Sequence, residues 1–101
     1  ESLYFLNNSC LEKKILQSIS SDESVRKIIL DAEGINDIDT SGEESLRKIT
    51  ESLRQEGCDL FLCSVKGPVR DTLHRSGFYN YLGRDHFFEN ITECVAANLS
   101  E

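Results

Sequence analysis

The stretch that decides the fold is residues 28–46, Ile-Ile-Leu-Asp-Ala-Glu-Gly-Ile-Asn-Asp-Ile-Asp-Thr-Ser-Gly-Glu-Glu-Ser-Leu. A short apolar run ends at Asp31 and gives way to a polar loop that contains Gly34. The loop closes on Asp39-Thr40-Ser41-Gly42, and a helical pattern starts immediately afterwards. A strand, a loop and a helix N-terminus in this order lie at the carboxyl end of a strand in open α/β folds, where ligands collect. We therefore expect the functional site here.

Strand and helix patterns alternate along the rest of the chain. Strand composition marks residues 3–6, 26–32 and 59–65, with a short last strand at 86–88. Apolar residues at helical spacing predict helices over about 10–19, 42–56, 68–76 and 91–99. The order β-α-β-α-β-α-(β)-α predicts a single α/β domain over residues 1–101, with a mostly parallel central sheet and helices packed against it. The chain begins inside or just before a strand, so this first strand appears truncated and is expected to lack a neighbour.

Composition narrows the classes of function. The chain has 101 residues, 39% of them hydrophobic, which suits one domain with one real core. A net charge of -7 argues against nucleic acid or an anionic lipid surface as the main partner. No apolar run approaches the roughly 20 residues that span a bilayer, and no signal-peptide pattern opens the sequence. The sequence therefore predicts a domain that is soluble in isolation. This prediction is compatible with a piece cut from a membrane protein.

The four cysteines, Cys10, Cys58, Cys63 and Cys94, form no C-x-x-C pair and match no zinc or redox spacing. Each lies in or directly beside a predicted strand or helix. We expect them to be small buried hydrophobic residues with free thiols.

Thr40 and Ser41 admit two interpretations. In the first, Ser41 and Glu44 form a capping box that starts the helix, a contribution of about 1 kcal/mol. In the second, one hydroxyl is modified or contacts a ligand, since a helix N-terminus favours phosphate. Negative charges in the same loop oppose an added phosphate by repulsion; they are Glu33, Asp37, Asp39, Glu43 and Glu44.

Neither a metal site nor an enzyme is predicted. The acidic loop lacks the spacing of a calcium-binding loop, so we interpret it as a solvated rim. His74 and His86 have no Cys or Ser in a recognised nucleophile context. No glycine-rich fingerprint indicates a nucleotide cofactor. The turn at Lys66, Gly67 and Arg70 places two cations at a helix N-terminus, where an anion or a partner could bind; a plain strand-to-helix turn explains it equally well.

Four stretches together carry a family resemblance. They are Ile29-Leu30-Asp31, Ile38-Asp39-Thr40-Ser41-Gly42 with Leu46, Ser2-Leu3-Tyr4-Phe5-Leu6-Asn7, and Val65-Lys66-Gly67-Pro68-Val69-Arg70-Asp71-Thr72-Leu73 with Ser76-Gly77-Phe78. With them the chain resembles a STAS domain, the module shared by sulfate transporters and anti-sigma factor antagonists. The resemblance covers nearly the whole chain, and the last two stretches are similar to the transporter branch.

The resemblance implies a cytoplasmic, non-catalytic domain of a SulP-type transporter of sulfate or a related anion such as bicarbonate. Its implied partners are the membrane domain of the same polypeptide, a second protomer or a cytoplasmic regulatory protein. The implied alternative is a free-standing anti-sigma factor antagonist that a kinase phosphorylates. The hydroxyl residue modified in that branch follows the loop aspartate, which places it at Thr40 here, with Ser41 next to it. Nucleotide binding has also been suggested for the family, and nothing in this loop indicates it.

Overall fold

The structure is a computed structural model that describes residues 2–6 and 25–99, with side chains from 26 to 98. In chain order the elements are β1 (Ser2–Leu6), β2 (Val25–Asp31), α2 (Thr40–Gln55), β3 (Asp59–Cys63), α3 (Gly67–Ser76), α4 (Phe78–Leu82), the 3-10 turn η1 (Arg84–His86), β4 (Phe87–Phe88) and α5 (Ile91–Leu99). The helix predicted over residues 10–19, and Cys10 with it, lie outside the described residues.

The described strands form one four-stranded sheet in the order β1-β2-β3-β4, and each neighbouring pair is parallel. Asp31, the last residue of β2, aligns with Cys63, the last residue of β3. The loops that follow these two strands therefore leave the sheet at the same edge. The prediction of an α/β fold with a parallel sheet is confirmed.

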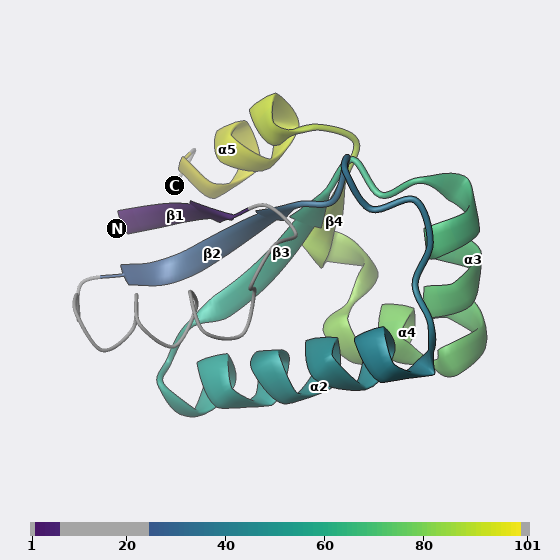
Figure 1. Cartoon of the computed structure of the whole chain (residues 1–101). Helices are drawn as coiled ribbons and strands as arrows, with labels where there is room; N and C mark the ends of the chain where they lie inside the picture. The colour runs from purple at the N-terminus through teal and green to yellow at the C-terminus, as the bar shows by residue number, and fades with distance from the viewer. Residues whose placement is uncertain (1, 7–24, 100–101) are drawn as a thin grey trace.

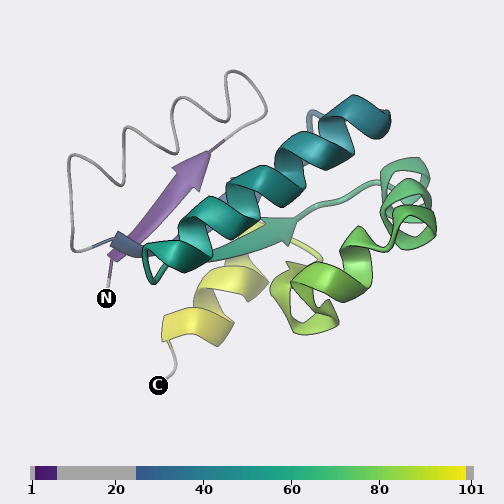
Figure 2. The ribbon, with the colours of Figure 1, turned by 90° about the horizontal axis from the view of Figure 1, so that it is seen from below.

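Apolar side chains cover both faces of this sheet, which explains the continuous hydrophobic runs in β2 and β3. On one face, Ile28, Leu30, Leu60 and Leu62 belong to a core cluster with the buried side of α2. On the other face, a smaller cluster joins the sheet to Cys94 of α5. Figure 1 shows α2 below the sheet and α5 above it. From below, α2 lies along the strands, and α3 and α4 lie beside it near one end (Figure 2).

Glycine and proline residues mark the helix ends. Gly57 follows α2 with φ of +76° and Gly77 follows α3 with φ of +86°, a region that residues with a Cβ rarely adopt. Pro68 lies in the first turn of α3, where its missing amide hydrogen costs nothing. The aromatic segment after Gly77 packs back on the core as α4, through Phe78 and Leu82.

Apolar residues of the strands and helices form the core. Leu30, Leu46, Ile49, Leu53, Leu60, Leu62 and Leu73 are buried, and Val95 is half-buried against the second cluster. Cys58, Cys63 and Cys94 are buried thiols that form no disulfide with one another, as expected.

Candidate functional site

The N-terminus of α2 is capped by Asp39, and this corrects the sequence interpretation. The Asp39 carboxylate accepts a hydrogen bond from the Gly42 amide at 2.8 Å, and the helix begins at Thr40. Ser41 lies inside the first turn, so the predicted capping box of Ser41 with Glu44 is wrong. A carboxylate two residues earlier satisfies the free amides equally well, and it adds a favourable interaction with the helix dipole.

Thr40 and Ser41 are both exposed at this helix N-terminus. Because Asp39 takes the capping role, neither hydroxyl is needed to start the helix. Within residues 26–98 no hydrogen bond engages either hydroxyl. These two side chains are therefore accessible to a partner or a modifying enzyme.

The loop between β2 and α2 is held by local hydrogen bonds. The Asp31 carboxylate accepts from the Glu33 amide at 3.0 Å, and the Asp37 carboxylate accepts from the Ile38 amide at 2.9 Å. At its start, the Ala32 amide donates to the Cys63 carbonyl of β3 at 2.9 Å. The loop is thus an ordered extension of the sheet edge.

Gly42 allows the loop to pack closely on the first turn of α2. A Cβ at this position would lie 2.8 Å from Cγ1 of Ile38, closer than side chains approach. Ile38 is half-buried and packs against the main core. Gly42 is therefore required by the packing of the loop.

Glu43 does not belong to the acidic rim in which the sequence analysis placed it. Its side chain is buried and pairs with the guanidinium of Arg47, one turn further along α2. Arg47 also donates to the Ser76 carbonyl at 2.8 Å and lies 5.1 Å from the centre of the Tyr81 ring. This pair fastens α2 to α3 and α4, and its charge is compensated. The sequence spacing of Glu43 and Arg47, four residues apart on a helix, was the available signal.

The turn at Lys66 lies against the same loop. The Lys66 ammonium donates to the side-chain oxygen of Asn36 at 2.5 Å. The Lys66 carbonyl accepts from the Arg70 amide at 2.8 Å in the first turn of α3, and Gly67 is exposed. The structure thus brings together the two stretches that the sequence analysis treated separately.

Ser64 adds a third contact at this edge that sequence reasoning missed. Its φ of +59° is unusual for a residue with a Cβ. Its amide donates to the Phe88 carbonyl at 3.1 Å and its hydroxyl to the Glu89 carbonyl at 3.4 Å. These bonds join the ends of β3 and β4 beside the loop. A positive φ at a serine has no sequence signal.

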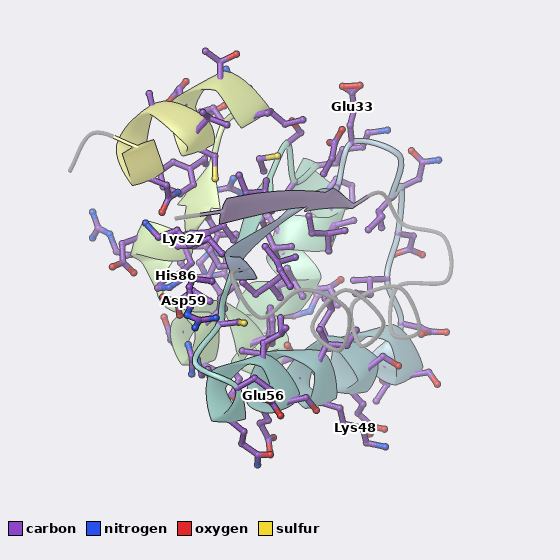
Figure 3. The ribbon with its side chains drawn as sticks, turned by 90° about the vertical axis from the view of Figure 1, so that its left-hand side faces the viewer. Lys27, Glu33, Lys48, Glu56, Asp59 and His86 are labelled. Carbon is purple, nitrogen blue, oxygen red and sulfur yellow. The ribbon has the colours of Figure 1, made fainter. Side chains whose placement is uncertain are left out.

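A second cluster, also missed from the sequence, lies at the opposite, amino end of the strands. Lys27, Asp59 and His86 line a cavity of about 430 Å³. Figure 3 shows these three side chains together, far from Glu33 in the β2–α2 loop. His74, by contrast, is exposed and stacks on Tyr79, with ring centres 3.9 Å apart.

Residues 1–94 match the STAS domain. The chain belongs to the STAS domain family. This STAS domain is 27% identical to "Sulfate transporter 1.3" of Arabidopsis thaliana over 93% of the chain, and 32% identical to "Sulfate transporter 3.1" of the same plant over 94%. It spans 16% of the length of each of these relatives.

Solved structures share the fold. A sulfate transporter family protein from Wolinella succinogenes aligns with a TM-score of 0.82 at 22% identity, covering 94% of this chain and 83% of the other. The STAS domain of a SulP transporter from Vibrio cholerae aligns with a TM-score of 0.78 at 16% identity, covering 97% and 80%. The structure of SLC26A9 aligns with a TM-score of 0.67 at 24% identity, covering 88% of this chain and 16% of that one.

None of the helices in the described part of the STAS domain combines the length and apolarity needed to cross a bilayer.

Proposed function

We propose that this STAS domain, with residues 1–101 as one unit, is the cytoplasmic, non-catalytic regulatory domain of a SulP-type anion transporter. The observation that carries the proposal is the match to sulfate transporters over more than nine-tenths of the chain but only 16% of their length. The remaining length of such a protein would supply the membrane-spanning path, for sulfate or a related anion such as bicarbonate. The STAS domain would act through contacts with that membrane domain, and a second protomer is a further partner.

The β2–α2 loop and the adjoining turn at Lys66 are the proposed contact surface. Glu33 and Asp37 are exposed on this loop, which the Lys66–Asn36 hydrogen bond holds in place, and Thr40 and Ser41 are exposed in the first turn of α2. The cytoplasmic loops of membrane proteins carry an excess of Lys and Arg. An acidic, ordered loop is complementary to such a surface, and this complementarity favours encounter and fixes orientation.

The full-length gene product gives the first test. It should contain a segment of several membrane-spanning helices before this domain; a gene product without one would contradict the proposal. The second test is anion uptake by the full-length transporter carrying Glu33→Lys and Asp37→Lys. We expect uptake to fall severalfold at unchanged protein abundance. Glu51→Lys, on the exposed side of α2, is the matched control and should leave uptake unchanged. Equal uptake by all three proteins would exclude this surface.

A second candidate function is a phosphorylation switch at Thr40 or Ser41. It is favoured by the exposure of both hydroxyls and by the cap at Asp39, which leaves them unused. The acidic loop opposes it, because a dianionic phosphate would meet Asp37 and Asp39. Incubation with a cognate kinase and ATP should add one phosphate to the domain. Thr40→Ala should either abolish this phosphate or shift it to Ser41. An unchanged mass of the domain after incubation with such kinases would exclude the phosphorylation switch, and only the contact function would remain.

A further inference from the structure

We propose that the cavity at the amino end of the strands binds an organic cation, specifically a guanidinium group on an apolar stem. The cavity measures about 430 Å³, within the range of small-molecule sites. It lies at the opposite end of the sheet from the β2–α2 loop, so the proposal stands independently of the transporter role.

The first observation is the carboxylate of Asp59, the first residue of β3. About half of its side chain is exposed (51%), and Nε2 of His86 lies 3.7 Å from its Oδ1. That distance is too long for a hydrogen bond, and within residues 26–98 this carboxylate accepts none. A carboxylate with open acceptor positions at a cavity binds a guanidinium group through two parallel hydrogen bonds.

The second observation is the imidazole between two carboxylates. His86 Nδ1 lies 3.0 Å from Asp85 Oδ1, and the hydrogen bond lowers the pKa of the Asp85 carboxyl. Nε2 of the same ring lies 3.7 Å from Asp59 Oδ1, beyond hydrogen-bond range, so the Asp59 carboxylate is left open to an external donor.

The third observation is an aromatic wall. The His86 ring stacks on the Phe61 ring, with ring centres 4.7 Å apart. The centre of the Phe88 ring lies 6.2 Å from that of Phe61. Planar guanidinium groups stack on such faces, and aliphatic stems pack on them. The Lys27 ammonium, the cation of the cavity, donates to the Asn98 carbonyl at 3.2 Å. Asp59 and Asp85 each contribute a carboxylate to the lining of the same cavity.

The probe is butylguanidinium, with neutral butylurea as its isosteric control, titrated into the folded domain and followed by NMR. We expect saturable shifts of the Asp59 and His86 signals with butylguanidinium, in the millimolar range typical of so small a ligand, and none with butylurea. Asp59→Asn should weaken binding about tenfold, because it removes a charge-assisted pair. Asp71→Asn, the same change at an exposed position on α3, should leave affinity within about twofold, allowing for the change in net charge.

Equal binding of both probes, no saturation, or equal weakening by the two variants would overturn the proposal. A capped Gly-Arg-Gly peptide separates two sources of the guanidinium group. Tighter binding than butylguanidinium would assign the cavity to an arginine side chain of a polypeptide, and weaker binding would assign it to a free small cation.

Discussion

The Lys66 ammonium donates to the side-chain oxygen of Asn36 at 2.5 Å, across 30 residues of sequence. This bond joins the turn before α3 to the loop before α2, and so it links the two stretches that carry the proposed contact surface.

Lys66→Met should loosen that loop with little loss of global stability. The hydrogen bond is exposed, and exposed polar pairs contribute about 0–1 kcal/mol. We expect faster amide hydrogen exchange at Ile35 and Ile38, with an unchanged rate in the buried strand β3. Unchanged exchange at both positions would show that the loop is held by its own turns alone.

Arg47→Ala should lower the free energy of unfolding by about 2–3 kcal/mol, because it leaves the buried Glu43 carboxylate without its partner. It also removes the hydrogen bond to the Ser76 carbonyl. Lys48→Ala, at the exposed next position, is the control and should change stability by less than about 0.5 kcal/mol. Urea denaturation of both variants measures the difference; losses of similar size would mean that Arg47 does not fasten α2 to α3 and α4.

Gly42→Ala should destabilise the domain by about 1–3 kcal/mol, since the new Cβ would lie 2.8 Å from Ile38. Gly67→Ala offers the matched comparison, because nothing lies within 4 Å of a Cβ there. Alanine lowers the conformational entropy of the unfolded chain, so that variant should be neutral or more stable by up to about 1 kcal/mol. Thermal melts of the pair give the sign directly. A stabilised Gly42→Ala protein would disprove the packing role.

Alkaline pH should destabilise the domain through Cys63. Burial, with smaller contributions from Asp31 and Cys94, raises the pKa of its thiol from 9.0 to about 11. A pKa raised by folding stabilises the folded state below the unfolded value, and that stability is lost as pH rises through the folded value. Stability should therefore fall between about pH 9 and 11, and Cys63→Ala should show a shallower fall. Equal slopes for the two proteins in chemical denaturation would contradict this assignment.

The sequence predicts the architecture well because the local signals agree with each other. The runs in β2 and β3 are apolar on both sides, and Gly57, Pro68 and Gly77 set the helix ends. The cap of α2 was predicted wrongly, because Asp39 and Ser41 are both good caps and only the backbone conformation chooses between them. Glu43 was wrongly assigned to the acidic rim. Its burial depends on the positions of α3 and α4, which the sequence around Glu43 does not indicate.

The loop that carries the candidate site was predictable, but its contacts with the rest of the fold were not. The end of β2 at Asp31 indicates where this loop begins. The bonds of Lys66 to Asn36 and of Ser64 to Glu89 join residues that are 30 and 25 positions apart. No pattern within either segment indicates them. The cavity at Asp59 and His86 is of the same kind, since it forms only when β3, η1 and α5 come together.

Photo-crosslinking in the full-length protein tests the central claim most directly. A photoreactive residue at position 40 samples the β2–α2 surface, and one at position 51 samples the exposed side of α2. We predict a crosslink from position 40 to the membrane domain and none from position 51. Equal crosslinking from both positions, or none from position 40, would contradict a regulatory contact at this loop.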